Sequence, residues 1–161
     1  MLFTGKVSKR FSGFFKKRNF LYIGRGYNFP TALEGALKLK EITYAHAHGY
    51  AAGEMKHGPI ALIHSEQLVV CLAPHSKTYE KMISNIEEIH ARKGIILSIA
   101  TDKDRAVARL SRSIFWIPKT SELFSPILTV IPLQLFAYYV AVFNRRDVDQ
   151  PRNLAKSVTV E

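Results

Sequence analysis

Short apolar runs alternate along this chain with longer segments of helical patterning, and this alternation restricts the folds open to it. The runs with strand character span residues 20–23, 67–73, 95–100 and 114–117. Segments with helical character lie between them, at residues 30–45, 77–92 and 105–110. Short apolar strands that alternate with helices form an open parallel sheet wrapped by those helices. We therefore predict an α/β fold with a doubly wound, mainly parallel sheet flanked by helices.

Proline and glycine mark several boundaries of these elements. Pro30 is favoured in the first turn of a helix, and Gly94 follows the second helical segment as a C-cap glycine would. Residues 46–59 are rich in Gly, Ala and His, and we predict that they form a loop.

Length and cysteine content indicate one domain in a reducing compartment. A chain of 161 residues supports a single core of normal size. The only cysteine, Cys71, lies in an apolar run, which predicts a core residue and excludes an intramolecular disulfide. No long apolar stretch follows Met1, so we expect no secretory signal and a cytoplasmic protein. The predicted divisions are a basic leader or linker helix at 1–18, a domain at 19–145 and a C-terminal tail at 146–161.

The formal charge of +10 raises the question of a polyanionic partner. In the leader, basic residues interleave with aromatic ones: Lys6, Lys9, Arg10, Phe11, Phe14, Phe15, Lys16, Lys17 and Arg18. That pattern also occurs in segments that bind nucleic acid or an anionic membrane surface. Charge alone reports solubility and non-specific attraction. We therefore expect neither nucleic acid nor membrane as a partner, and a short amphipathic helix or linker ahead of the first strand.

Residues 124–143 carry no formal charge and precede two arginines, which by length and flank suits a membrane span. Polar residues and prolines within the run stand against a span: Ser125, Pro126, Thr129, Pro132 and Gln134. A helix that covers a parallel sheet is also nearly uniformly apolar. We predict the covering helix.

Gly24 and Gly26 follow a predicted strand and precede a predicted helix, where the backbone approaches a ligand in dinucleotide-binding folds. The third glycine of that fingerprint is missing because position 29 is Phe, and no Walker lysine–serine pair is present. A tight turn without a ligand explains these glycines equally well. We predict no cofactor.

Glu34, Lys38 and Glu41 lie at positions i, i+4 and i+7 of the first helix and share an arc of about 60°. The apolar residues to one side of that arc are predicted to face the core: Leu33, Ala36, Leu37 and Tyr44. An exposed Glu–Lys pair, which stabilises a helix by a few tenths of a kcal/mol, accounts for the spacing without any ligand.

Two further groups of residues have chemical potential but admit plainer explanations. His57 lies before Gly58 and Pro59, and a single histidine is more often structural than catalytic; no Cys or carboxylate completes a familiar metal-ligand spacing, so we predict no metal site. In the tail, Lys156 has small neighbours, so it can approach a carbonyl closely and act as a nucleophile once desolvated. A solvated basic tail explains the same composition.

Three motifs resemble those of a known family, and this resemblance bears on the alternatives above. They are ALEGALKLKE at 32–41, AAGEMKHGP at 51–59 and DQPRNLAKSVTVE at 149–161. In this order they resemble the C-terminal part of the glutamine–fructose-6-phosphate aminotransferase family, also called glucosamine-6-phosphate synthases, and the similarity extends from about residue 20 to residue 161. The resemblance implies a sugar isomerase (SIS) domain, a doubly wound sheet specialised for phosphosugars.

The resemblance also implies roles for individual residues. Lys156 would form a Schiff base with the C2 carbonyl of fructose 6-phosphate, and Glu41 would move a proton between C1 and C2. Lys38 would support the developing negative charge. His57 would open the sugar ring from the neighbouring subunit of a homodimer, and the tail would close over the site and exclude water. Residues implied to bind the substrate are Glu34, Arg152 and Ala155.

The chain departs from the family in what it lacks. The family takes ammonia from a glutaminase domain with a cysteine after the initiator Met, whereas position 2 is Leu here. In the family, Ser- and Thr-rich loops of a preceding SIS domain hold the sugar phosphate, and a separate chain would have to supply them. We therefore expect a fragment with little activity alone in forming glucosamine 6-phosphate. The main alternative is a non-catalytic, sugar-phosphate-binding SIS module.

Overall fold

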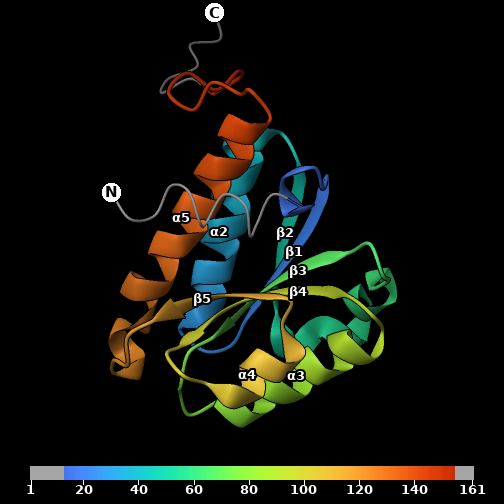
Figure 1. The fold of residues 1–161 in the computed structure, drawn as a ribbon, viewed down its shortest axis with the longest axis vertical. Helices are drawn as coiled ribbons and strands as arrows, with labels where there is room; N and C mark the ends of the chain where they lie inside the picture. Colours follow the sequence, from blue (N-terminus) through green and yellow to red (C-terminus); the bar gives the residue numbers. More distant parts are fainter. Residues whose placement is uncertain (1–12, 155–161) are drawn as a thin grey trace, which may run out of the picture.

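The computed structural model describes residues 13–154, which form one five-stranded sheet with helices on both faces (Figure 1). Every pair of neighbouring strands is parallel, and the order across the sheet is β2-β1-β3-β4-β5. The strands are β1 (Asn19–Gly24), β2 (His46–Ala51), β3 (Leu68–Ala73), β4 (Ile95–Thr101) and β5 (Ser113–Ile117). The predicted α/β fold with a doubly wound parallel sheet is confirmed.

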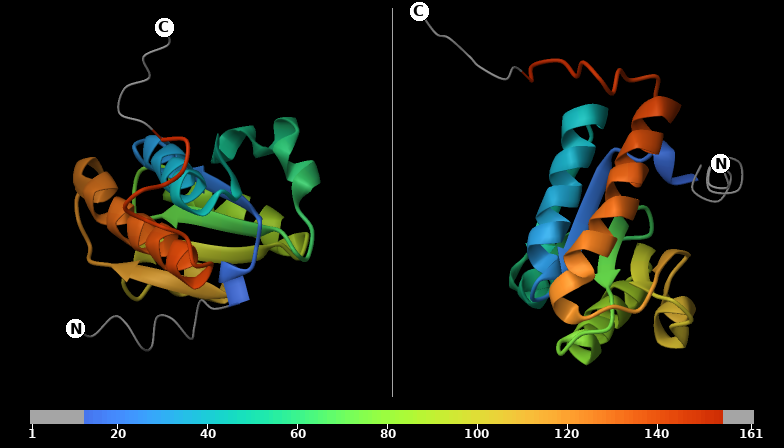
Figure 2. Two further views of the ribbon diagram at one scale, coloured as in Figure 1. Left: turned by 90° about the horizontal axis from the view of Figure 1, so that it is seen from above. Right: turned by 90° about the vertical axis from the view of Figure 1, so that its left-hand side faces the viewer.

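The helices divide between the two faces of this sheet (Figure 2). One face carries α2 (Asn28–Thr43) and α5 (Ser125–Phe143), which also pack against each other. The other face carries α3 (Tyr79–Ala91) and α4 (Arg105–Leu110). Three short 3₁₀ segments complete the described elements: η1 (Ala52–His57), η2 (Pro59–Leu62) and η3 (Glu122–Phe124).

The strand pattern follows from burial on both faces. All residues of β3 and β4 are buried, so these strands have continuous apolar character rather than an alternating pattern. Alternate residues of β3 point to opposite faces, so Val70 packs with the α2–α5 layer and Cys71 with the α3 layer. Cys71 is fully buried, and burial raises the pKa of its thiol, as expected for a core residue.

The prediction of a loop at residues 46–59 is wrong for its first part, because β2 lies there as an edge strand. β2 pairs only with β1, and Ala47 is buried while His46 and His48 are exposed. An edge strand needs little apolar character, which is why its composition resembled a loop. Gly49 brings α2 close, since a Cβ there would lie 2.8 Å from Leu33 Cδ2 and 3.0 Å from Leu33 Cα.

The prediction that Gly94 caps α3 is displaced by one residue. Lys93 is the residue with positive φ (63°), and its N–H donates to His90 O while the Gly94 N–H donates to Ile89 O. Those two bonds form a Schellman motif in which Gly94 is the second residue beyond the cap. Glycine is needed there for space, because a Cβ would lie 2.8 Å from Ile89 Cγ2 and 2.9 Å from Ile63 Cγ2.

The core-facing side of α2 also differs from the prediction. Leu33 and Leu37 are exposed, and the buried stripe consists of small residues with one leucine: Thr31, Ala32, Gly35, Ala36, Leu39 and Thr43. Small residues let α5 approach, as shown by Gly35, where a Cβ would lie 2.8 Å from Leu133 Cδ1. Close helix packing therefore takes precedence over burial of the larger leucines.

The uncharged run that precedes the tail forms α5. By length and composition alone, Glu122–Phe143 would suffice to cross a membrane. In the structure one side of α5 packs on the sheet and α2, as the predicted covering helix does. The residues on that side are Leu133, Phe136, Ala137 and Val140. Apolar residues remain exposed on the other side: Ile127, Ile131, Leu135, Tyr138 and Val142.

Part of the predicted leader belongs to the packed domain. Phe14 and Phe15 are buried in the core cluster that also contains Phe20 and Phe136. The Asn144 side chain donates a hydrogen bond to Phe15 O at 2.8 Å, which joins this segment to the end of α5. Residues 1–12 lie outside the described residues.

Candidate functional site

The three charged residues that sequence spacing placed on one arc of α2 do come together, and we call them the α2 charge cluster: Glu34, Lys38 and Glu41. Lys38 Nζ lies 2.7 Å from Glu41 Oε2 and 3.8 Å from Glu34 Oε1. The side chain of Glu41 is 25% exposed, against 36% for Lys38 and 41% for Glu34. A carboxylate in a charged contact thus stands at the surface, within reach of a ligand.

Lys38 is held in its protonated form by this arrangement. The hydrogen bond to Glu41 raises the pKa of Lys38 above its ordinary value, partial burial opposes that shift, and the charges of Glu41 and Glu34 add to it. The ammonium group therefore supplies a fixed positive charge beside Glu41. Such a pair suits chemistry in which negative charge develops on a bound molecule.

The C-terminal end of α2 also meets the described part of the predicted tail, residues 146–154. Arg152 N–H donates a hydrogen bond to Tyr44 Oη at 2.9 Å, and the Arg152 guanidinium lies 4.3 Å from the centroid of the Tyr44 ring. Arg152 is thereby fixed at the same end of α2 as Glu41. Ala155 and Lys156 lie outside the described residues.

His57 lies in a different part of the molecule. It ends η1 and is exposed, and Gly58 follows with φ = 143°, a backbone angle that favours glycine. The η1 segment packs on the α3 face through Ala52 and Met55, and Lys56 forms an ion pair with Glu88 of α3 at 2.9 Å. The sheet therefore separates His57 from the face that carries Glu41.

Gly24, which ends β1, and Gly26, which follows it, are explained by the turn into α2. A Cβ at Gly24 would lie 2.3 Å from Asn28 O, and Gly26 has φ = 53°. The turn is closed by backbone hydrogen bonds from Asn28 N–H to Arg25 O and from Phe29 N–H to Gly26 O. Both glycines are thus required by the tight turn, the alternative that needs no ligand.

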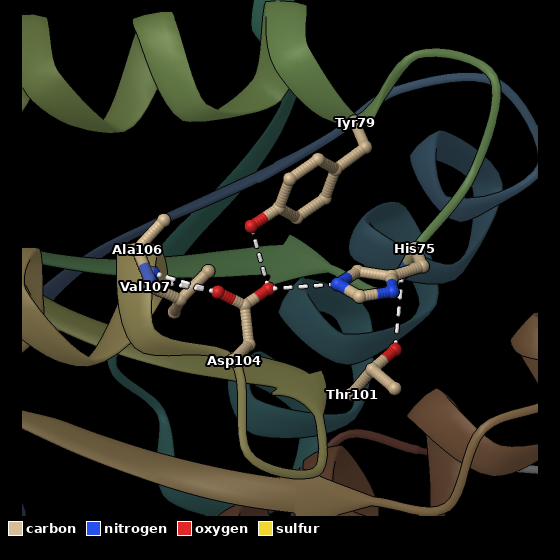
Figure 3. A network of polar contacts seen from close by, with 6 residues as sticks. All are labelled: His75, Tyr79, Thr101, Asp104, Ala106 and Val107. Carbon is tan, nitrogen blue, oxygen red and sulfur yellow. Dashed lines mark hydrogen bonds and ion pairs between the residues drawn. The ribbon is translucent and has the colours of Figure 1, made fainter.

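A second polar cluster, which sequence patterning did not indicate, lies beyond the carboxyl ends of β3 and β4 (Figure 3). We call it the Asp104 network: His75, Tyr79, Thr101 and Asp104. Asp104 Oδ2 accepts a hydrogen bond from Tyr79 Oη at 2.6 Å and lies 3.2 Å from His75 Nε2, while Thr101 Oγ1 accepts from the His75 backbone N–H at 3.0 Å.

The Asp104 network also caps a helix. Asp104 Oδ1 accepts from the backbone N–H groups of Ala106 and Val107, both at 3.0 Å, at the start of α4. The Asp104 side chain is only 2% exposed. Burial and the hydrogen bond to Asp104 raise the pKa of the Tyr79 hydroxyl. Both carboxylate oxygens are therefore engaged within the protein.

The model of the SIS domain family matches residues 13–143. The chain belongs to the SIS domain family. The similarity to aminotransferases noted from the three motifs is also confirmed by relatives that share most of this SIS domain.

Two of these relatives are isomerizing glutamine–fructose-6-phosphate aminotransferases. The protein from Chlorobaculum tepidum is 59% identical over 144 residues, which cover 89% of this chain and 24% of the relative. The protein from Aquifex aeolicus is 57% identical over 156 residues, which cover 97% of this chain and 26% of the relative. The chain thus spans about a quarter of the length of the curated relatives it matches.

Solved structures are similar to this chain in fold. The C-terminal domain of glucosamine-fructose-6-phosphate aminotransferase from Francisella tularensis is 37% identical, with a TM-score of 0.78 over 90% of this chain and 40% of that one. Glucosamine-6-phosphate deaminase from Thermotoga maritima has a TM-score of 0.69 at 21% identity, over 98% of this chain and 47% of that one. The second likeness shows the shared fold alone.

Within residues 13–154 of this SIS domain, no three His, Cys, Asp or Glu side chains gather as metal ligands would. Of the residues proposed from the sequence, Glu34, Lys38 and Glu41 lie together and Arg152 lies at the same helix end. His57 is apart from them.

Proposed function

We propose that this SIS domain is the sugar-handling C-terminal part of a glutamine–fructose-6-phosphate aminotransferase, which converts fructose 6-phosphate to glucosamine 6-phosphate. The proposal rests on two features at the C-terminal end of α2. Glu41 forms an ion pair with Lys38 there, and the segment that leads to Lys156 contacts the same helix end. The names of the relatives support a phosphosugar as the substrate. The cytoplasm is the compartment we propose.

The chemistry assigns one step to each group. The neutral amine of Lys156 adds to the C2 carbonyl of the open-chain sugar, and loss of water leaves a Schiff base. Ammonia then displaces the lysine at C2. Glu41 takes a proton from C1 and returns it to C2, while the proton of the C1 hydroxyl is lost and the C2 nitrogen gains one, so that C1 becomes the aldehyde and C2 carries the amino group. Lys38 stabilises the negative charge that develops as the proton leaves C1.

Sugar contacts complete the proposed site. Glu34 is the most exposed member of the α2 charge cluster, so it is free to accept hydrogen bonds from sugar hydroxyls. Arg152 and Ala155 are proposed to bind the sugar from the tail, which closes over the intermediate and excludes water.

We place His57 in the site of a neighbouring copy of the chain, where it opens the sugar ring. This proposal draws on the position of η1 on the face of the sheet opposite to α2. To test it, inactive His57→Ala and Lys156→Ala enzymes are mixed under conditions that exchange subunits. Recovered activity is expected, because one site in each heterodimer regains both residues. Exchange without recovery would place His57 in the site of its own chain.

The phosphate of the sugar is assigned to loops outside this chain. The matched relatives are about four times longer than the aligned region, so a preceding SIS domain is the proposed source. The exposed apolar side of α5 borders a groove of about 190 Å³ between β5 and α5, lined in part by Trp116, Ile131 and Leu135. We propose that this surface is covered by the preceding domain, in the same chain or a separate one.

Borohydride reduction in the presence of fructose 6-phosphate tests the whole assignment. In the complete aminotransferase, mass spectrometry is expected to find the reduced sugar adduct on Lys156. The Lys156→Arg enzyme should lose the adduct, whereas Lys40→Arg, an exposed lysine on α2, should keep it. This chain alone should be labelled weakly and gain labelling when the preceding domain is added. Saturable sugar binding without any adduct would instead identify a non-catalytic SIS module.

A further inference from the structure

The segment after α5 contacts the side chain of Tyr44 at two points. α5 ends in a Schellman motif in which Arg145 has φ = 55°, the Arg145 N–H donates to Val142 O and the Arg146 N–H donates to Ala141 O. This turn redirects the chain across the C-terminal end of α2 (Figure 2). Arg146 is the first residue to leave the turn, and its guanidinium lies 5.3 Å from the centroid of the Tyr44 ring.

Six residues after Arg146, the chain contacts the Tyr44 ring again. Asp147 Oδ1 accepts hydrogen bonds from the backbone N–H groups of Asp149 and Gln150, at 2.9 and 3.0 Å, which tighten the intervening turn. Arg152 then places its guanidinium 4.3 Å from the Tyr44 ring centroid and donates its N–H to Tyr44 Oη. Residues 146–152 thus form a loop whose two ends both contact Tyr44.

Tyr44 is itself rigidly placed. It is the C-cap residue of α2 with φ = 62°, an uncommon backbone conformation for a residue other than glycine, and its N–H donates to Lys40 O. The Nε atom of Arg146 is buried without a hydrogen-bond partner among residues 13–154. The ring face is therefore the contact the structure provides for that guanidinium, a cation–π interaction.

We propose that Tyr44 is a positioning residue for Lys156: by clamping both ends of loop 146–152, it fixes Arg152, the point from which the chain continues to the catalytic lysine. Lys156 follows Arg152 by four residues, so their Cα atoms lie no more than about 14 Å apart. Glu41 precedes Tyr44 by three residues on the same helix end. The importance of this clamp for catalysis rests on the proposed function, whereas the clamp itself is a property of the described residues.

Amide hydrogen exchange measures the clamp without any substrate. In Tyr44→Phe the ring stays but the acceptor for Arg152 N–H is lost, so that amide should exchange about threefold to tenfold faster, as for the loss of one hydrogen bond. The amides of Asp149 and Gln150, which bond to Asp147, should be unchanged. Tyr44→Ala also removes the ring and should accelerate exchange at all three amides. Tyr27→Phe, an exposed tyrosine just before α2, serves as the matched control and should alter none of them.

Kinetics of the complete aminotransferase then test the positioning role. Tyr44→Phe should lower kcat and the rate of borohydride trapping at Lys156 by about threefold to tenfold, with KM for fructose 6-phosphate within a factor of two. Tyr44→Ala should lower both rates further, and Tyr27→Phe should leave them as in the parent. A role in stability alone would lower the melting temperature without this difference between kcat and KM.

The outcomes separate the two proposals. An Arg152 amide that exchanges equally fast in parent and Tyr44→Phe proteins overturns the clamp. Faster exchange with unchanged trapping at Lys156 overturns the positioning role and leaves the proposed function intact. A parent enzyme with no adduct on Lys156 overturns the proposed function, while the exchange data still report on the clamp independently.

Discussion

The α2 charge cluster and the Asp104 network are both groups of polar side chains, but they use their hydrogen-bonding capacity differently. In the Asp104 network the carboxylate is almost fully buried, and each of its oxygens contacts two partners within the protein. In the α2 charge cluster, Glu41 contacts Lys38, and a quarter of the Glu41 side chain remains exposed. The first cluster is saturated by the fold, and the second keeps capacity for a ligand.

Position strengthens this contrast. In open α/β sheets, ligands usually bind beyond the carboxyl ends of the strands, which is where His75 and Asp104 lie. Here the polar groups at the carboxyl ends of the strands bond to one another. Because α2 connects two parallel strands, its C-terminal end, with Glu41, lies near the amino ends of the strands. In the proposed function, the chemistry of this domain therefore lies on a helix flank, a location suited to completing a site built mainly by another domain.

Replacing Glu41 should have the largest effect and should separate chemistry from folding. Glu41→Gln in the complete enzyme is expected to lower kcat by about a hundredfold or more, because the amide cannot accept the C1 proton. KM and the melting temperature should change little. The control is Glu87→Gln, an exposed carboxylate on α3. A variant with more than a third of the parent turnover would return Glu41 to a role as a helix-surface carboxylate.

The Asp104 network should respond in the opposite way. Asp104→Ala removes the cap of α4 and leaves the Tyr79 hydroxyl without its partner, which together should lower the free energy of unfolding by about 2 kcal/mol. Turnover of the folded enzyme should stay within a factor of two. Urea denaturation measures the first quantity and steady-state kinetics the second.

Two further variants sharpen this stability prediction. Tyr79→Phe should cost about 1 kcal/mol, because it removes one hydrogen bond and keeps the cap. Asp102→Ala, an exposed neighbour of Asp104, should be nearly neutral. A large loss of turnover in Asp104→Ala, at unchanged stability, would mean that the Asp104 network takes part in catalysis. The contrast between the two clusters would then be wrong.

The smallest effect concerns Lys38 and pH. Its pKa is raised in the folded chain, chiefly by Glu41, so the associated stability is fully present below the unfolded value of about 10.5 and is lost as pH rises through the folded value. The pair is partly exposed and screened by solvent, so Lys38→Met should cost only about 0.3–0.5 kcal/mol at pH 7. That difference should shrink as pH rises through the pKa of Lys38 in the folded chain.

Sequence patterning predicted the parts of the fold that depend on neighbours in sequence or on burial from both sides. β3 was predicted because each of its residues is buried, and the α2 charge cluster because helical spacing alone brings its members together. β2 was missed because an edge strand carries exposed histidines, His46 and His48. Local pattern also placed Leu33 in the core, where packing between helices selects Gly35 instead.

The contacts that sequence did not reveal join residues that are distant along the chain. Tyr44 and Arg152 are 108 positions apart, and Tyr79 and Asp104 are 25 apart. No periodicity relates such pairs, because the topology of the sheet and the ends of its helices bring them together. The roles assigned to Lys156 and Ala155 come from resemblance to a family. Both residues lie outside the described residues.

The packing of α5 against α2 has a consequence for the order of folding. The Asn28 side chain donates to Ser125 across a separation of 97 residues, and Asn144 bonds to Phe15 across 129. Contacts with such large sequence separations form late, because a long loop must close before they stabilise the chain. During synthesis, the helix that carries Glu41 therefore gains its supporting layer only after α5 has emerged from the ribosome. Nascent chains that stop before α5 should leave the small-residue stripe of α2 uncovered and become substrates for chaperones and proteases.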